Sequence, residues 1–377
     1  MNMTHGNEQN DKQQRTEGQR DSDKAVTSQA ASIGQKWHAR YVAARARLDD
    51  TAALCDLYVR LHNLQAVDHV SVDALYAGER FARPESVALI TGSFNPLTTA
   101  HVALAEAALR EGGFDMIVWG IATSTIDKEM VERASLEDRF TQLIAFSHVF
   151  PDGAVVAFNK GLYVDEARAL RQVLPADCTI NIVVGFDKIV QILDPRYYSD
   201  REVALRELFE LASIRVAPRA EFGEAALREL LAQPDNRRYQ DMVAYLPLNP
   251  VYAAKSSTEV RALARRQETI AEPEEPVKRV LTPEGAALVA LGPYEDTAAG
   301  TAQDQYMIRL RWIRLLARLA EESRHELPRM GELERATREN AGLAEELTTA
   351  AGNAIDTLPE AGIRRLVRLA TQRHFNS

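Results

Sequence analysis

The feature that most constrains the fold is a strand signal that ends in a tight turn and leads at once into a helix. Residues 87–91 are apolar or β-branched, and Gly92-Ser93 follows them. Asn95-Pro96 continues the turn, and an alanine-rich stretch begins at His101, a side chain that can be charged near neutral pH. Strand, glycine turn and helix N-terminus together favour anion binding, because N–H groups and the positive end of the helix dipole converge there. A plain strand-to-helix connection, with a histidine that caps the helix, would give the same local pattern.

Strand and helix signals alternate from Ser86 to about Phe222, which predicts an α/β fold. Short alternating runs of this kind imply crossover connections and a doubly wound, mostly parallel sheet. In such sheets ligands bind beyond the carboxyl ends of the strands. The expected strands are 87–91, 116–122, 154–158, 179–184, 214–217 and 242–246. The expected helices are 101–110, 135–146, 163–174 and 201–212.

The rest of the chain divides into flanking regions by composition. Residues 1–34 are polar and poor in large apolar side chains, so we expect a disordered tail. Residues 35–85 carry apolar residues at mostly helical spacing, which predicts a helical N-terminal extension. The α/β domain is expected over 86–295, with a separate α-helical C-terminal domain over 300–377.

The C-terminal region has three helical patterns, over 306–320, 330–350 and 361–373. The first of them carries a row of arginines, which predicts a solvated face opposite its leucines and isoleucine. A docking face for a protein partner or a second copy of the chain is the alternative. The arginines are Arg309, Arg311, Arg314 and Arg318.

Composition excludes several classes of function. The chain has 377 residues, 46% of them hydrophobic and 26% charged, as in soluble globular proteins. A net charge of −9 argues against a general nucleic-acid surface. Cys55 and Cys178 lie far apart and the histidines form no cluster, so no structural metal site is expected. No apolar run approaches the ~20 residues of a membrane span, and no secretory signal is visible, which predicts a cytoplasmic protein without membrane contact.

A second polar cluster lies at Lys255-Ser256-Ser257-Thr258, with Arg261 one turn further on. Hydroxyl groups at the start of a helix commonly cap its unpaired N–H groups. The same hydroxyls, with the arginine, can instead hold a nucleotide triphosphate. The cluster alone leaves both readings open.

Taken together, three motifs resemble those of the nucleotidylyltransferase superfamily. They are Gly92-Ser93-Phe94-Asn95-Pro96 with Thr98-x-x-His101, then Gly185-x-Asp187, then Ser256-Ser257-Thr258-x-x-Arg261. Within the superfamily the chain is similar to nicotinamide and nicotinate mononucleotide adenylyltransferases. The Thr-x-x-His form resembles the eukaryotic-type branch. The resemblance covers about residues 86–295 and neither flanking region.

The resemblance implies a Rossmann-like domain that transfers AMP from ATP to a pyridine mononucleotide in NAD biosynthesis and releases pyrophosphate. The acceptor phosphate would attack the α-phosphorus directly, while the protein supplies positioning and charge neutralisation. Mg²⁺ would bridge the phosphates, held mainly by ATP and water. ATP and the mononucleotide are therefore the expected partners.

The resemblance also implies roles for single residues. Thr98 and His101 would contact the ATP phosphates, and Arg261 would grip the triphosphate during transfer. The remaining ATP-binding candidates are Gly92, Ser93, Phe94, Gly185, Asp187, Ser256, Ser257 and Thr258.

The acceptor pocket matches the family less well. Lys128 is a candidate for a substrate phosphate, and Tyr163 falls where the family has an aromatic residue that stacks on the pyridine ring. Asp165 and Glu166 replace the small hydroxyl residue expected beside that ring. A carboxylate there would favour the carboxamide-bearing mononucleotide over the acid, so Glu166 is a third acceptor-binding candidate.

Two other functions fit these departures. One is a nucleotidylyltransferase with a different phosphorylated acceptor. The other is a non-catalytic nucleotide-binding regulatory module with the C-terminal helices as its partner-binding part. Groups suited to a transferring phosphoryl, such as His101, favour an enzyme.

Overall fold

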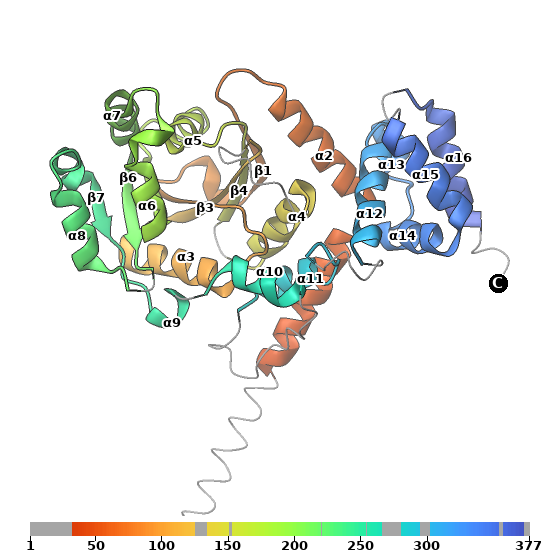
Figure 1. Cartoon of the computed structure of the whole chain (residues 1–377), viewed down its shortest axis with the longest axis horizontal. Helices are drawn as coiled ribbons and strands as arrows, with labels where there is room; N and C mark the ends of the chain where they lie inside the picture. The colour runs from red at the N-terminus through yellow and green to blue at the C-terminus, as the bar shows by residue number, and fades with distance from the viewer. Residues whose placement is uncertain are drawn as a thin grey trace, which may run out of the picture.

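A seven-stranded sheet forms the centre of the molecule (Figure 1). The computed structural model describes residues 32–124, 134–150, 153–219, 221–253, 255–265, 280–294, 302–353 and 357–372. The strand order is β1-β4-β3-β2-β5-β6-β7, and all neighbouring pairs are parallel except β1 with β4. This confirms the expected α/β, doubly wound class. The strands are β1 (Val72–Ala77), β2 (Ser86–Thr91), β3 (Met116–Ala122), β4 (Gly153–Phe158), β5 (Thr179–Gly185), β6 (Ala212–Ala217) and β7 (Val243–Tyr245).

Helices follow most of the strands and continue beyond the sheet. In the sheet region they are α2 (Thr51–Gln65), α3 (Thr99–Gly112), α4 (Leu136–Ser147), α5 (Tyr163–Arg171), α6 (Phe186–Ile192), α7 (Arg201–Leu211), α8 (Glu224–Ala232), α9 (Pro250–Ala253), α10 (Ser257–Arg265) and α11 (Pro283–Val289). The C-terminal helices are α12 (Ala302–Leu316), α13 (Glu321–Arg324), α14 (Met330–Glu339), α15 (Ala341–Asn353) and α16 (Glu360–Thr371). Short 3₁₀ turns are η1 (Glu79–Ala82), η2 (Pro195–Tyr197) and η3 (Arg237–Met242).

Helices cover both faces of the sheet, as the near-continuous apolar strands require. Val87 and Leu89 of β2 point into one core, which α5, α6, α7 and α8 close. Ala88 and Ile90 point to the opposite side, where α2, α3 and α4 pack. The alternation of side chains along each strand therefore fixes which face each helix covers.

The edge strand β1 was not expected from the sequence. Its six residues include Asp73 and none of them is fully buried, so it lacks the apolar run that marks the central strands. Arg60 of α2 holds Asp73 with two hydrogen bonds, of 2.5 and 2.9 Å. Pairing with β4 thus supplies the stability that the strand's own composition does not.

The described part of the N-terminal region begins with a helix. Residues 1–31 of the expected disordered tail lie outside the described residues, and a helix runs over 32–48. Arg40 of this helix forms a two-pronged ion pair with the buried Glu284 of α11, with both N–O distances at 2.9 Å. Ala44 and Leu48 pack against α4 and α11. Among the described residues, no helix is long and apolar enough to cross a membrane.

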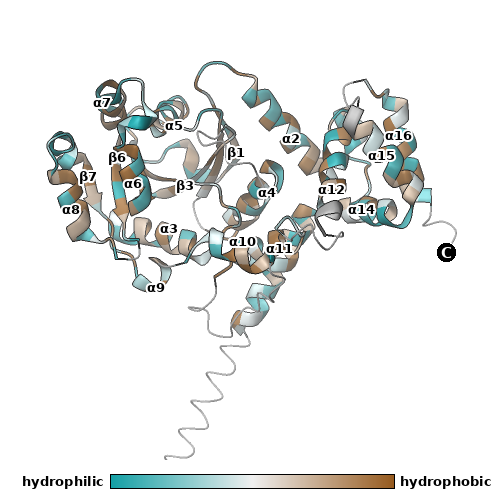
Figure 2. Ribbon diagram, viewed as in Figure 1, coloured by the Kyte–Doolittle hydropathy of each residue, from teal (hydrophilic) through white to brown (hydrophobic). Residues whose placement is uncertain are grey.

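The C-terminal helices share a core with α2. Leu54 and Cys55 of α2 are buried among Trp312, Leu315 and other apolar residues of α12, α14, α15 and α16. In Figure 1 these helices form a bundle at one end of the molecule, with α2 between it and the sheet. In Figure 2 hydrophobic and hydrophilic residues interleave along α16, of which Ile363 and Leu366 are buried. The expected helix over 330–350 is divided at Asn340 into α14 and α15.

The arginine row of α12 is not a single solvated face. Arg314 and Arg318 are exposed as expected, but Arg309 is 2% exposed and pairs with Asp138 of α4. The sequence pattern was wrong for Arg309, because periodicity along one helix carries no information about a buried carboxylate on another.

Deletion of residues 300–377 is expected to give an unstable or insoluble protein. The deletion would expose the apolar surface of α2 and leave the buried Asp138 without its arginine. Soluble expression and circular dichroism of the truncated chain would test this. A soluble, cooperatively folded fragment would show instead that the sheet domain is self-sufficient.

Candidate active site

The loop over residues 92–98 leaves the carboxyl end of β2 and has its backbone carbonyls turned toward side chains. Four consecutive carbonyl oxygens each accept a hydrogen bond from the side chain of a residue on α4 or α10. Carbonyl oxygens that are engaged in this way cannot face a bound phosphate, so the arrangement removes repulsive groups from the site. The pairs are Arg139 Nη1 to Ser93 O (3.1 Å), Gln142 Nε2 to Phe94 O, Arg261 Nη1 to Asn95 O (2.8 Å) and Ser257 Oγ to Pro96 O (2.8 Å).

Further hydrogen bonds fix the middle of the loop. Gln142 Oε1 accepts from the Leu97 N–H at 3.0 Å, so this one buried side chain holds the loop at two points. The hydroxyl of Tyr294 donates to Asn95 Oδ1 at 2.7 Å. The Phe94 ring is buried against Trp119 and lies edge-on to the His101 ring, 5.0 Å between centroids. The side chain of Phe94 therefore packs against the His101 ring and supports it.

Thr98 and His101 form a capping box at the start of α3. The Thr98 N–H donates to His101 Nδ1 at 3.0 Å, and Thr98 Oγ1 lies 2.9 Å from the same nitrogen. Because a backbone N–H can only donate, Nδ1 is the acceptor and carries no proton in this arrangement. The neutral ring then bears its proton on Nε2. Thr98 is fully buried, so it positions His101 from within the protein.

His101 is neutral near pH 7 in this structure, which corrects the expectation of a readily charged donor. Burial, with a smaller contribution from the charge of Arg219, lowers the pKa of His101 to about 4. Protonation of Nδ1 would also break the bond with the Thr98 N–H. The imidazole can therefore offer its Nε2–H as a hydrogen-bond donor without a charge of its own.

The second motif joins the 92–98 loop through α10. Ser257 and Arg261 bond to loop carbonyls, and Arg261 Nη2 also donates to Thr258 Oγ1 at 3.1 Å. Ser256 Oγ accepts from the Glu259 N–H at 3.2 Å, which is the capping role weighed from the sequence. Side chains of α10 thus contact loop residues that lie 161 and 166 positions earlier in the chain, as the combined motif implied.

Asp187 lies beyond the carboxyl end of β5, at the start of α6. Its carboxylate is 3.5 Å from Arg219 Nε, and Arg219 also donates to the carbonyls of Ala253 and Lys255. Gly185 is the residue before α6 and has open space where a side chain would be. Arg219 was missed by the sequence reasoning, although it stands two residues after a predicted strand, where parallel sheets bind ligands.

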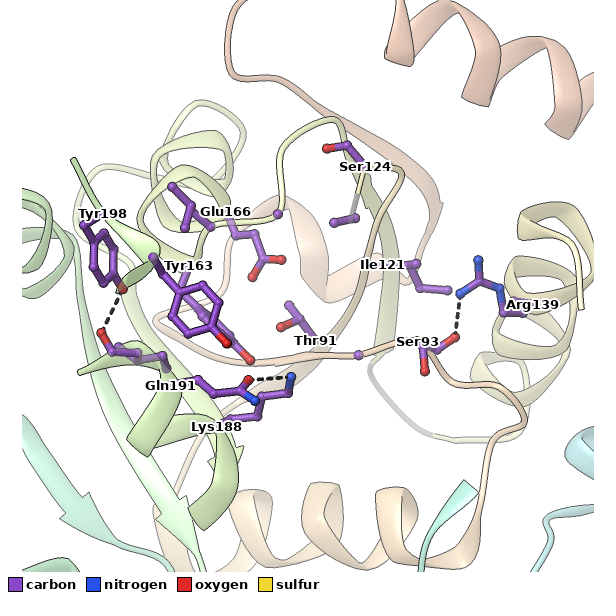
Figure 3. Close-up of a pocket in the computed structure, with 16 residues that line it drawn as sticks. Thr91, Ser93, Ile121, Ser124, Arg139, Tyr163, Glu166, Lys188, Gln191 and Tyr198 are labelled. Carbon is purple, nitrogen blue, oxygen red and sulfur yellow. Dashed lines mark hydrogen bonds between the residues drawn. The ribbon is translucent and has the colours of Figure 1, made fainter. Parts of the chain in front are cut away.

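A cavity of about 380 Å³ adjoins the start of the 92–98 loop (Figure 3). It lies at the carboxyl ends of β2 and β3. From β2 the chain adds β3 and β4 on one side of the sheet and β5, β6 and β7 on the other. Gly92 and Ser93 line it, together with Tyr163 and Glu166 of α5. Lys188 of α6 also lines it, and its Nζ donates to Gln191 Oε1 at 2.9 Å. The volume lies within the range of about 300–1,000 Å³ typical of small-molecule sites.

The structure thus groups the candidates into two neighbouring sets. Gly92, Ser93, Tyr163 and Glu166 surround the cavity, whereas Thr98, His101 and the α10 residues lie around the rest of the loop. Lys128 lies outside the described residues. Among the described residues no three carboxylate, histidine or cysteine side chains come together as metal ligands. Residues that the sequence reasoning missed are Gln142, Lys188, Arg219 and Tyr294.

Comparison with known proteins shows which family the chain resembles. The cytidylyltransferase-like family model matches residues 89–263. The chain is 33% identical over 133 residues to a probable nicotinate-nucleotide adenylyltransferase of Agrobacterium fabrum, covering 34% of this chain and 67% of that protein. It is 29% identical over 150 residues to a protein of the same description from Trichlorobacter lovleyi, covering 38% of this chain and 65% of the relative.

Solved structures also align with the chain. The nicotinic acid mononucleotide adenylyltransferase of Plasmodium falciparum, complexed with NaAD, aligns at 15% identity and a TM-score of 0.39, covering 54% of this chain and 94% of that one. The family-model match lies in the sheet domain and includes the 92–98 loop and residues 257–263 of α10. The chain therefore belongs to the cytidylyltransferase-like nucleotidylyltransferases and resembles nicotinate-nucleotide adenylyltransferases within them.

Proposed function

We propose that the protein transfers AMP from MgATP to the phosphate of nicotinamide or nicotinate mononucleotide, giving the dinucleotide and pyrophosphate. The observation that carries this proposal is the 92–98 loop, with its carbonyls held away and His101 Nε2–H available beside it. Such a loop between a strand end and a helix N-terminus suits a polyphosphate. The adjoining cavity gives room for an acceptor.

In this proposal the side chains position the substrates and stabilise charge, and no residue forms a covalent bond with AMP. His101 Nε2–H donates to ATP phosphate oxygens as charge develops on them. Arg261 and the hydroxyls of Ser256 and Thr258 hold the triphosphate, and Asp187 accepts hydrogen bonds from a ribose. Mg²⁺ enters as part of the MgATP substrate and is held by phosphate oxygens and water. The acceptor lies against Tyr163 in the cavity, with its phosphate toward the loop.

The direct test is turnover by the purified full-length chain. MgATP is supplied with either mononucleotide, and dinucleotide and pyrophosphate are measured together. Equal amounts of both products would support the proposal. ATP binding by calorimetry without turnover on either mononucleotide would contradict it, and would favour another phosphorylated acceptor or a regulatory nucleotide-binding role.

A further inference from the structure

Glu166 is a buried acid that points into the cavity without a full set of partners (Figure 3). Its side chain belongs to α5 and the residue is 4% exposed. Its Oε2 has no hydrogen-bond partner among the residues that the structure describes. An unpaired buried polar atom is costly, because it has lost its hydrogen bonds with water. A ligand that fills the cavity would supply the missing partner.

The surroundings of Glu166 favour its protonated form. Burial raises the pKa of Glu166 well above its ordinary value, and the charge of Asp165 on the same helix raises it further. A hydrogen bond with Thr91 of β2 and the charge of Lys188 on α6 oppose this rise without cancelling it. Burial likewise raises the pKa of the Tyr163 hydroxyl beside it. Asp165 itself is paired with Arg168 at 2.8 Å.

Besides Glu166 and Lys188, the cavity is lined by one more charged side chain, Arg139, among the described residues, and it lies away from Glu166. Arg139 of α4 lines the same cavity and donates to Ser93 O. Figure 3 shows Arg139 on the side of Ile121 and Ser93, and Glu166 between Tyr163 and Thr91. Arg139 therefore lies at the end of the cavity next to the loop, whereas Glu166, whose protonated form is favoured by burial, lies beside the aromatic ring of Tyr163.

We propose that Glu166 recognises the ring substituent of the acceptor and selects a primary carboxamide over a carboxylate. This inference rests on the proposed function, which places a pyridine ring against Tyr163. A protonated acid and a primary amide form two hydrogen bonds: the acid O–H donates to the amide carbonyl, and an amide N–H donates to the acid carbonyl. A ring carboxylate offers only acceptors. It takes the O–H bond, but its second oxygen faces the carbonyl oxygen of Glu166 without a hydrogen between them.

The selectivity should increase with pH. When Glu166 loses its proton it still accepts from the amide N–H, so the carboxamide keeps one charge-assisted bond. A ring carboxylate then meets a like charge in a buried site and loses its only bond. The ratio of kcat/KM for nicotinamide mononucleotide to that for nicotinate mononucleotide therefore rises as pH increases through the pKa of Glu166.

The test compares the wild-type chain with Glu166→Gln over pH 6 to 9. A glutamine is uncharged and can donate to a carboxylate, so the ratio should fall by about tenfold and lose its pH dependence, on the scale of one hydrogen bond to a charged group. Glu229→Gln, on the exposed surface of α8, is the matched control and should leave the ratio unchanged. Thermal midpoints of all three proteins check that they fold alike.

The outcomes separate this inference from the proposed function. Turnover by the wild type with a ratio that neither pH nor Glu166→Gln changes overturns the role of Glu166 and leaves the adenylyl transfer intact. Absence of turnover, with no binding of either mononucleotide by calorimetry, overturns both. Absence of turnover with tighter binding of the carboxamide form, lost in Glu166→Gln, supports the role of Glu166 and contradicts the proposed reaction alone.

Discussion

Replacement of His101 by asparagine is expected to lower kcat/KM for ATP by about 10²–10³-fold, the typical effect of removing one donor to a developing oxyanion. Asparagine keeps an acceptor near the position of Nδ1, so the bond from the Thr98 N–H and the start of α3 should survive. It lacks a donor at the position of Nε2. The variant therefore removes the proposed catalytic contact with little change to the fold. Steady-state kinetics and the thermal midpoint are the measurements.

Two further variants sharpen the test. His101→Ala removes both the donor and the capping acceptor, so it should lose activity to the same degree and some stability as well. His101→Gln can place an amide N–H near the position of Nε2 and should recover part of the rate. Near-wild-type activity in His101→Asn would show that the imidazole contributes only the helix cap.

The pH profile of kcat/KM for ATP gives an independent check, because it reports the free enzyme. With a pKa of about 4, His101 is already deprotonated at pH 5 and stays so to pH 8. Its titration should therefore reduce activity only as pH falls toward 4. A loss of activity as pH rises through 6 to 7, present in the wild type and absent in His101→Asn, would show that the charged imidazole is the active form.

Central strands were predictable from the sequence because they are buried on both faces. Residues 116–122 form a continuous apolar run, and residues 179–184 are apolar or β-branched except Asn181; the structure has β3 and β5 at these positions. The edge strand β1 has no such run, since only one of its sides is paired and its residues stay partly exposed. Asp73, the second residue of β1, also interrupts its apolar pattern.

The site was predictable where its chemistry is local and not where it depends on contacts between distant segments. Ser256 at a helix start and His101 after a glycine turn are visible as short motifs. Gln142 is not, because its function is to bond two points of a loop 45 and 48 residues away. Glu166 was identified as a candidate carboxylate, but the rise of its pKa follows from burial, which only the folded chain creates.

Loss of Arg309 is the second change with a large expected effect, because it would leave a buried carboxylate unpaired. Asp138 is fully buried, with Arg309 Nη2 at 2.7 Å from its Oδ1 and the Tyr306 hydroxyl at 2.6 Å from its Oδ2. Although burial lowers the pKa of Arg309, the charge and hydrogen bonds of Asp138 raise it above its ordinary value. Removing one partner of such a pair costs about 3–5 kcal/mol. We therefore expect Arg309→Met to unfold at a markedly lower denaturant concentration.

Arg365→Ala is the matched control, because its pair with Glu346 is solvent-exposed and 3.3 Å long. Exposed pairs contribute little, so this variant should keep the wild-type midpoint. Arg309→Met combined with Asp138→Asn should lose less stability than the two single variants added together, since the second change removes the charge that the first left unpaired. Strict additivity would show that the two side chains do not interact.

The same pair should also affect the site, since Asp138 precedes Arg139 on α4 and Arg139 holds Ser93 of the loop. In Arg309→Met, the start of α4 loses its contact with the C-terminal helices, and the loop loses the support of a firmly placed Arg139. We expect kcat/KM for ATP to fall in this variant at temperatures where circular dichroism still shows a folded protein. Full activity in the folded variant would mean that the C-terminal helices stabilise the chain without positioning the 92–98 loop. Reduced activity that Arg365→Ala does not share would show that these helices hold the loop in place through Arg309, Asp138 and α4.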